Sequence, residues 1–82
     1  MFEFLPYSEI EKYLPEIIDN NVSEVARSKD QFLDQYKKYG KNLPEFWLKK
    51  RENFIKRHLA SYKTKLTYRR KLALIAWAYF PN

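Results

Sequence analysis

Residues 44–62 read PEFWLKKRENFIKRHLASY, and the spacing of their apolar and basic side chains predicts one amphipathic helix. At about 100° per residue, one side collects the large apolar residues, an arginine and the single histidine. That side carries Trp47, Leu48, Arg51, Phe54, Ile55, His58, Leu59 and Tyr62. The opposite side carries Lys49, Lys50, Asn53, Lys56, Arg57, Ala60 and Lys63. The stretch therefore predicts a helix with a core face and a basic face, with Pro44 suited to its first turn.

A short helix is predicted near the N-terminus, after an aromatic arm. Ser8 and Glu11 form a capping-box pattern that opens a helix over residues 9–14. Pro15 interrupts this helix, because a proline inside a helix removes a hydrogen bond. Residues 15–20 are compatible with a further helical turn.

Residues 21–39 predict a longer helix. It begins near Asn21, with Glu24 in the capping-box position. It ends before Gly40, the single glycine of the chain, which can take the left-handed conformation that follows many helices. An apolar stripe at helical spacing, broken only by Lys29, is expected to face the core. The stripe consists of Val22, Val25, Ala26, Phe32, Leu33, Tyr36 and Tyr39.

The last predicted helix spans residues 67–80, capped by Thr67 or Thr64 and stopped by Pro81. From residue 72 to 80 it is apolar all round, which is typical of a helix buried on most sides or shared with a second chain. We therefore expect either burial within the monomer or a homodimer contact through this C-terminal helix. The side chains expected at such a contact are Ile75, Trp77, Tyr79 and Phe80.

Length and composition favour one small all-α domain covering residues 1–82. One Gly and four Pro leave little scope for the tight turns of a β-rich fold, whereas 45% hydrophobic residues supply a helical core. We expect a bundle of about four helices, in which residues 1–20 form the arm and short helix. Segments 21–39 and 44–62 are expected to pack antiparallel, with 67–80 in their groove. The last two segments could also form a helix-turn-helix-like pair.

Charge is polarised along the chain. Residues 1–41 hold six Lys and Arg against eight Asp and Glu, a net −2, whereas residues 42–82 hold ten against two, a net +8. Such a distribution favours an anionic partner, which includes nucleic acid, an acidic protein face and anionic lipid. Lipid is the least favoured of these, because the polar and apolar stripes are needed for the fold itself.

The basic face of residues 44–62 predicts phosphate contacts, because only Glu45 and Glu52 interrupt its cations. The alternative is an ordinary solvated helix face. A second cluster, Arg69 to Lys71, opposes the dipole of the last helix and indicates an anion site. The alternative there is pairing with acids of the N-terminal half, such as Glu16, Glu24, Asp30 or Asp34. The candidate nucleic-acid-binding residues are Lys49, Lys50, Lys56, Arg57, Lys63, Arg69, Arg70 and Lys71.

Two tyrosines beside these cations, Tyr62 and Tyr68, are candidate stacking residues for unpaired bases, although a core role explains most aromatics in so short a chain. His58 is predicted to be a packed core histidine. No catalytic triad can be assembled around it. The sequence also has no carboxylate pair in an apolar setting, no glycine-rich phosphate loop and no metal-ligand spacing. We therefore expect no enzyme activity, no catalytic residue, no metal, no cofactor and no small-molecule substrate.

The C-terminal half also resembles a class of viral proteins. Its pattern is Arg51-x-x-Phe54-x-x-Arg57-His58, followed by Arg70-Lys71-Leu72-Ala73-Leu74-x-Ala76-Trp77. Over roughly residues 22–80, the chain is similar to short, uncharacterised basic helical proteins encoded by bacteriophages. The resemblance implies a phage protein that works in a host cytoplasm, and it assigns no activity to any residue.

The sequence therefore predicts a non-enzymatic nucleic-acid-binding protein, with DNA as the expected target. It would contact the phosphate backbone through the basic face of its C-terminal half, without evident base specificity. The alternative is a small viral or regulatory protein that binds and modulates an acidic host protein. The absence of Cys, and of a basic and apolar export signal in residues 1–7, predicts a cytoplasmic location.

Overall fold

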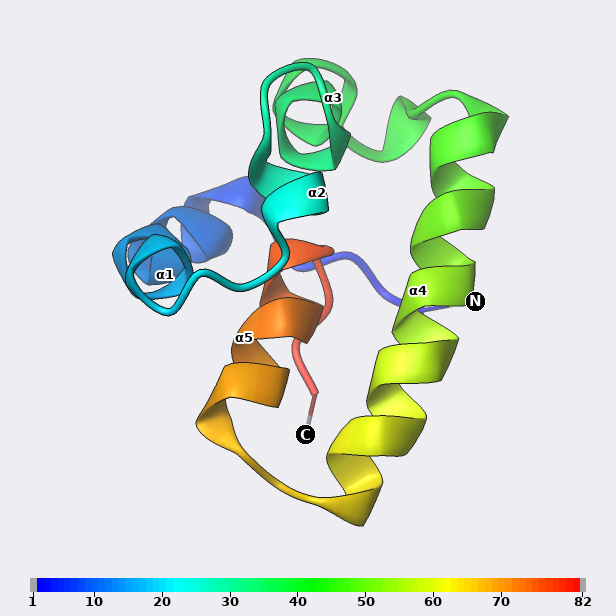
Figure 1. The fold of residues 1–82 in the computed structure, drawn as a ribbon. Coiled ribbons are helices and arrows are strands. Elements are labelled where there is room, and N and C mark those ends of the chain that lie inside the picture. The colour runs from blue at the N-terminus through cyan, green and yellow to red at the C-terminus, as the bar shows by residue number, and fades with distance from the viewer. Residues whose placement is uncertain (1, 82) are drawn as a thin grey trace.

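Five α-helices and one short 3-10 helix form the regular structure of residues 2–81, the part of the chain that this computed structural model describes (Figure 1). The elements are α1 (Tyr7–Asp19), α2 (Glu24–Arg27), α3 (Phe32–Tyr39), η1 (Gly40–Asn42), α4 (Glu45–Thr64) and α5 (Tyr68–Ala76). No strand occurs within residues 2–81, so the predicted all-α class is confirmed. Met1 and Asn82 belong to the predicted domain 1–82 but lie outside the described residues.

α5 is the central element of the fold. It packs against α1 on one side and α4 on the other (Figure 1). Every residue from 72 to 78 is buried, and Ile75 and Trp77 have no exposed surface. Burial within one chain therefore explains why this helix is apolar all round. Two of the side chains expected at a homodimer contact, Ile75 and Trp77, are therefore buried within the monomer.

The core around Trp77 is largely aromatic. The ring centroid of Trp77 lies 4.4 Å from that of Phe54 in α4 and 4.9 Å from that of Phe32 in α3. Phe32 also stacks on Tyr36, with centroids 5.8 Å apart. Aromatic rings bury large areas, which lets a chain of this length build one continuous core.

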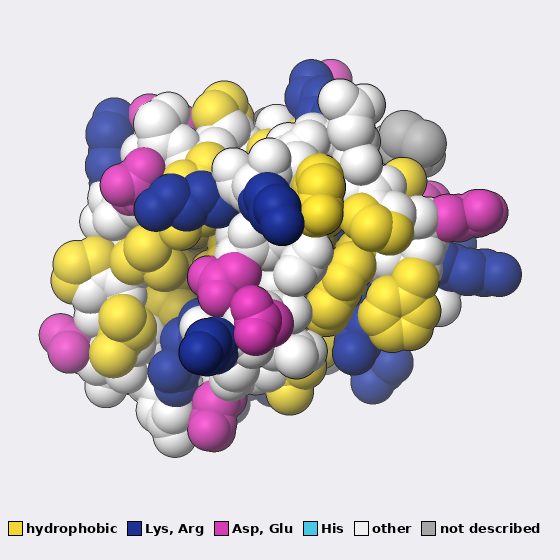
Figure 2. Space-filling view, turned by 90° about the horizontal axis from the view of Figure 1, so that it is seen from above, with side chains coloured by type: hydrophobic (Ala, Val, Ile, Leu, Met, Phe, Trp, Pro, Cys, Tyr) yellow, Lys and Arg dark blue, Asp and Glu magenta, His cyan; other side chains and the backbone are white. Residues whose placement is uncertain are grey.

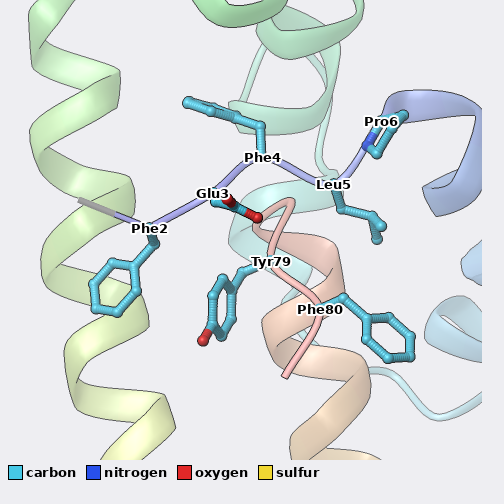
Figure 3. A pocket seen from close by; sticks show the side chains of 7 residues that line it. All are labelled: Phe2, Glu3, Phe4, Leu5, Pro6, Tyr79 and Phe80. Carbon is cyan, nitrogen blue, oxygen red and sulfur yellow. The ribbon is translucent and has the colours of Figure 1, made fainter. Parts of the chain in front are cut away.

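The N-terminal arm, residues 2–6, lies beside the tail that follows α5 (Figure 3). The N–H of Leu5 donates a hydrogen bond to the carbonyl of Ala78 at 2.7 Å. The hydroxyl of Tyr36 donates to the carbonyl of Leu5 at 2.8 Å. Phe4 stacks on the ring of Tyr36, with centroids 5.4 Å apart. Backbone and side-chain bonds therefore fix the arm against α3 and the C-terminal tail.

α1 runs through Pro15, where the sequence predicts an interruption. Pro15 has no N–H to donate to the carbonyl of Glu11, so α1 lacks one hydrogen bond there. The buried face compensates, because Ile10 and Ile17 have no exposed surface and α1 packs against α5. These isoleucines are seven residues apart and share one side of a continuous helix. The predicted end at residue 14 is therefore wrong.

The single helix predicted over residues 21–39 is two helices, and it starts later than expected. Asn21 and Ser23 adopt positive φ angles of 51° and 50°, so α2 begins only at Glu24. The chain between α1 and α2 is thus a turn. Positive φ is several-fold enriched in Asn, but periodicity and capping patterns alone do not reveal it.

α2 and α3 are separated at the point where Lys29 breaks the apolar stripe. Ser28 is extended, with ψ of 159°, and Asp30 has a φ of 61°. The hydroxyl of Ser28 donates to the carbonyl of Glu24, and the N–H of Asp30 donates to the Asp34 carboxylate at 2.8 Å. Short polar side chains that bond nearby backbone thus override the helical periodicity.

α3 ends at Tyr39, as predicted. Gly40 has a φ of 60° with ψ of −136°, a conformation reserved for glycine but different from the expected left-handed helical one. Figure 1 shows α3 nearly end-on, whereas α4 lies along the page. The predicted antiparallel packing of these two segments is therefore wrong, and the central position belongs to α5.

α4 and α5 form a hairpin through residues 65–67. The Thr67 cap is confirmed, because its hydroxyl oxygen accepts from the N–H of Arg70 at 3.3 Å. The two helices run side by side in opposite directions (Figure 1). A helix-turn-helix pair crosses at a steep angle, so the helix-turn-helix-like expectation for residues 44–62 and 67–80 is wrong.

α5 ends at Ala76 and not at the predicted residue 80. Ala78 adopts a φ of 62°, which no α-helix accommodates. The carbonyls of Trp77 and Ala78 have no partner within the helix, and both accept hydrogen bonds from Arg51 at 2.8 Å. Arg51 of α4 is thus a C-terminal cap for α5, supplied by a different helix.

Candidate nucleic-acid interface

The basic face predicted for residues 44–62 is the solvent-facing side of α4. The other side of the helix contains Ile55 and Arg51, both buried. The exposed cations are Lys49, Lys56, Arg57 and Lys63, and Lys50 is half-buried. At about 1.5 Å per residue, the cations from Lys49 to Lys63 extend over about 21 Å of this face.

The cations of this face have no carboxylate partner. Within residues 2–81 a single ion pair forms, between Lys12 and Glu9 of α1, at 2.8 Å. Lys50 instead lies over aromatic rings, with its Nζ 5.2 Å from the centroid of Trp47 and 5.6 Å from that of Phe46. The outer face of α4 is therefore a strip of uncompensated positive charge. Ordinary solvated helices mix signs to form pairs three or four residues apart.

The face of the molecule drawn in Figure 2 carries charges of both signs. In Figure 2, Lys and Arg side chains alternate with Asp and Glu, and apolar side chains lie between them. Residues 1–41, which supply α1, α2 and α3, carry a net −2. Excess positive charge is thus concentrated in the segment that contains α4 and α5.

The arginines at the start of α5 bind helix ends. Arg69 Nη1 donates to the carbonyl of Asn20, after the last turn of α1, at 2.7 Å. Arg70 Nη1 donates to the carbonyls of Ser61 and Lys65, at the end of α4, at 2.9 and 3.4 Å. These carbonyls carry the negative ends of two helix dipoles, which offsets the cost of cations at the positive end of α5. Pairing of these arginines with Glu16, Glu24, Asp30 or Asp34 does not occur.

The remaining candidates differ in accessibility. Lys71 is half-buried, and its Nζ lies 4.5 Å from the ring centroid of Phe80. Tyr62 is half-buried against the core. Tyr68 is 50% exposed, and its hydroxyl donates to the carboxylate of Glu16. This hydrogen bond raises the pKa of Tyr68 to about 12. Tyr68 therefore offers the more accessible ring, and base stacking by either tyrosine stays a prediction.

Arg51 is the buried charge that links three parts of the chain. Besides Trp77 and Ala78, its guanidinium donates to the carbonyls of Phe2 at 3.1 Å and Glu3 at 2.8 Å. Burial lowers the pKa of Arg51 to about 10, so the group stays charged at neutral pH. Its hydrogen bonds go to backbone carbonyls, and it is 2% exposed. Arg51 is therefore a structural residue and contributes no surface for an anion.

His58 packs on Phe54 as predicted, but it is half-buried and lines a cleft, so it is not the core histidine that the sequence predicts. Its ring lies 3.9 Å from that of Phe54 between centroids, with planes only 15° apart. Burial, and then the neighbouring charge of Arg57, lower the pKa of His58. The imidazole is therefore neutral at neutral pH.

His58 and Phe54 line a cleft of about 460 Å³ between α4, α5 and the turn that joins α1 to α2. The same cleft is lined by Arg69, Arg70 and Ser61. Sequence reasoning placed the arginines at an anion site but did not group them with residues of α4. In the sequence, this group is visible only as His58 and Ser61, three residues apart. That spacing is too common to indicate a site.

A second hollow, of about 510 Å³, lies between the N-terminal arm and the C-terminal tail. Figure 3 shows the side chains of Phe2, Phe4 and Leu5 from the arm, with Tyr79 and Phe80 from the tail. Its lining is aromatic and apolar, and its single charged residue is an acid. This hollow is therefore unsuited to an anion.

Within residues 2–81, no group of His, Asp and Glu side chains is arranged to hold a metal ion. No helix in that range is long and apolar enough to cross a membrane. Comparisons with protein-family models, curated proteins and solved structures find no match for this chain.

Proposed function

We propose that the chain is a non-enzymatic nucleic-acid-binding protein whose outer α4 face contacts the phosphate backbone of DNA. One observation carries this proposal: the exposed cations of α4 have no carboxylate partner within residues 2–81. Lys49, Lys56 and Lys63 recur every seven residues, so they lie on one line about 10 Å apart. A regular row of cations can follow a regular row of phosphates and release their counterions.

The proposed contacts carry little sequence information. Between the cations of the outer face lie Asn53 and Ala60, so one amide is the only uncharged group suited to reading a base edge. Phosphate contacts fix the position of a protein on a duplex without specifying bases. We therefore propose binding with weak base preference. Of the other predicted contacts, Arg69 and Arg70 line a separate cleft, and Lys71 lies over the ring of Phe80.

The test is fluorescence anisotropy of labelled DNA at several salt concentrations. A duplex of about 20 base pairs is longer than the ~21 Å row of cations on α4, and a single strand of the same length serves for comparison. If four phosphates are neutralised, the logarithm of the binding constant falls with the logarithm of salt at a slope near −3.6. Absence of binding at low salt would exclude the proposal.

A matched pair of charge reversals separates a specific face from net charge. Lys56→Glu with Arg57→Glu reverses two exposed cations of α4, and we expect a loss of at least tenfold in DNA affinity. Lys37→Glu with Lys38→Glu reverses two exposed cations of α3 and changes the net charge equally. We expect this control to lose less than about threefold. Equal losses would show that α4 has no particular role.

A second candidate is binding to an acidic protein, as expected for a small viral or regulatory inhibitor. Two apolar side chains near the ends of α4 favour it, because Phe46 is 65% exposed and Leu66 is 72% exposed. Apolar groups within a positive surface fit a protein partner better than a phosphate backbone. Leu66→Ser with Phe46→Ser should weaken a protein complex and leave DNA affinity unchanged. Loss of DNA affinity in this variant would show that Phe46 and Leu66 do not distinguish protein binding from DNA binding.

A further inference from the structure

The cleft between α4 and α5 differs chemically from the outer face of α4. Its volume of about 460 Å³ lies within the range of small-molecule sites. Two arginines, a histidine, an asparagine and three hydroxyl-bearing residues line it, and no Asp or Glu does. A concave wall that carries hydrogen-bond donors and positive charge but no carboxylate suits an anionic ligand.

The two arginines of the cleft are held in place but keep unused donors. Arg69 and Arg70 each use Nη1 for backbone carbonyls, of Asn20 in one case and of Ser61 and Lys65 in the other. A guanidinium has five N–H donors, so Nη2 and Nε of both residues remain without an acceptor within residues 2–81. The existing bonds fix the side chains before a ligand arrives, which lowers the entropic cost of binding.

The wall formed by α4 adds a hydroxyl and an aromatic surface. The hydroxyl of Ser61 forms no hydrogen bond within residues 2–81, although its carbonyl accepts one from Arg70. Ser61 lies three residues after His58, so both project from the same side of α4. The stacked rings of Phe54 and His58 form part of the same wall. An organic ring attached to the anion could pack there.

We propose that this cleft binds a phosphomonoester of nucleotide size. Arg69, Arg70 and Ser61 hold the phosphate, and the attached nucleoside lies toward the rings of Phe54 and His58. A phosphomonoester carries close to two negative charges near neutral pH and has three acceptor oxygens, which matches two guanidinium groups and a hydroxyl. The phosphate comes either from the 5′ end of a nucleic-acid strand or from a free nucleotide. This site is separate from the outer face of α4 and does not depend on duplex binding.

The first test uses the unmodified protein and a matched pair of ligands. Adenosine 5′-monophosphate is titrated into isotopically labelled protein while backbone amide NMR signals are followed, and adenosine serves as the ligand that lacks phosphate. We expect saturable shifts at Ser61, Arg69 and Arg70 with the nucleotide and none of comparable size with adenosine. Equal shifts with both ligands, or shifts spread along the outer face of α4, would overturn the proposal.

Variants then identify the groups that hold the phosphate. Arg69→Gln removes one of the two guanidinium groups, and we expect about tenfold weaker nucleotide binding. Ser61→Ala removes a hydroxyl with no other hydrogen bond within residues 2–81, so it leaves the fold intact, and we expect a severalfold loss. Lys56→Gln is the control, because it removes one charge from the side of α4 that faces away from the cleft. If Arg69→Gln and Lys56→Gln weaken binding equally, the cleft is not the site.

The source of the phosphate is decided with short single strands of about eight nucleotides, with and without a 5′-phosphate. Tighter binding of the phosphorylated strand, lost in Arg69→Gln, assigns the cleft to strand ends. Equal binding of both strands, with nucleotide binding retained, assigns it to free nucleotides. Lys49→Glu with Lys56→Glu reverses two exposed cations of the outer face of α4 and should leave nucleotide binding within about twofold. Failure of the duplex proposal and failure of this one therefore give different results.

Discussion

Arg51 shows how far the sequence predicts a single residue. The helical pattern places it correctly on the apolar side of residues 44–62. Its role was not predictable, because its acceptors in the C-terminal tail are 26 and 27 residues away and are backbone carbonyls. Carbonyls at a helix end leave no trace in a pattern of side chains. A buried arginine without an acid thus marks a capping function that only the tertiary structure reveals.

Replacement of Arg51 should destabilise the fold strongly. Arg51→Met removes the side-chain donor of the buried Trp77 carbonyl and one of the two donors of the Ala78 carbonyl, which keeps the N–H of Leu5. It also removes the donor of the part-buried carbonyls of Phe2 and Glu3. We expect the free energy of unfolding to fall by about 3 kcal/mol, measured by urea denaturation. The control is Arg57→Met, the same substitution at an exposed site of α4, with a change within about 0.5 kcal/mol. Similar losses in both variants would contradict the capping role.

His58 should make the stability depend on pH. Its pKa in the folded protein is lowered, first by burial and then by Arg57, whereas the unfolded chain has the ordinary value of 6.5. Below pH 6.5 the unfolded state therefore binds the proton more readily. The contribution of His58 is fully present above pH 6.5 and is lost as the pH falls through the lowered folded-state pKa.

The check is urea denaturation at pH 7.5 and at pH 5.5, compared with His58→Gln. Since His58 is the only histidine of the chain, the variant should lose less unfolding free energy than the unmodified protein over this interval. The carboxylates are the same in both proteins, so their contribution cancels. An identical pH dependence in both would mean that His58 is not buried as described.

For the helices, the sequence predicted the boundaries correctly where the apolar periodicity and the positions of Pro and Gly agreed. Residues 44–62 differ from α4 by only one or two residues at each end, because the apolar pattern persists and Pro44 marks the start. Prediction failed where they disagreed. Pro15 indicated a break in α1 that packing against α5 overrides, whereas Asp30 and Ser28 divide a segment whose apolar stripe suggested one helix. Local bonds and tertiary packing decide such conflicts, and neither is visible in the sequence.

The continuity of α1 leads to a simple prediction for Pro15→Ala. Alanine restores the missing N–H donor to Glu11 and has a higher helix propensity, and both effects stabilise a helix that continues through this position. Greater freedom of the unfolded chain opposes them by up to about 1 kcal/mol. We expect a net gain of about 1 kcal/mol or more in the free energy of unfolding, measured by urea denaturation. A loss of stability would support the interrupted helix instead.

At the scale of the whole molecule, the sequence predicts the charge distribution but not the cleft. The net +8 of residues 42–82 follows from counting, and the structure confirms that four cations of α4 are exposed. The cleft requires α5 to lie back against α4, with the turn after α1 closing one side. The expected arrangement put residues 67–80 in a groove between other helices, so no pattern brought Arg69 close to His58. Proximity between residues distant in sequence is what the fold adds.

The uncompensated charge of α4 should lower the stability of the protein in low salt. Asn53→Glu with Ala60→Glu places two acids three or four residues from the cations of α4, so we expect a higher melting temperature in low salt than for the unmodified protein. The gain should shrink as salt rises to about 0.3 M, because exposed charges are screened.

Lys12→Glu provides the opposite control, since it breaks the Lys12–Glu9 ion pair and places two like charges together on α1. It should lower the melting temperature in low salt. If the two acids in α4 destabilise the protein as Lys12→Glu does, repulsion among the α4 cations does not limit the stability of the fold. If they stabilise the fold while weakening DNA binding, the positive strip is retained at a cost in stability, as expected for a surface that meets an external anion.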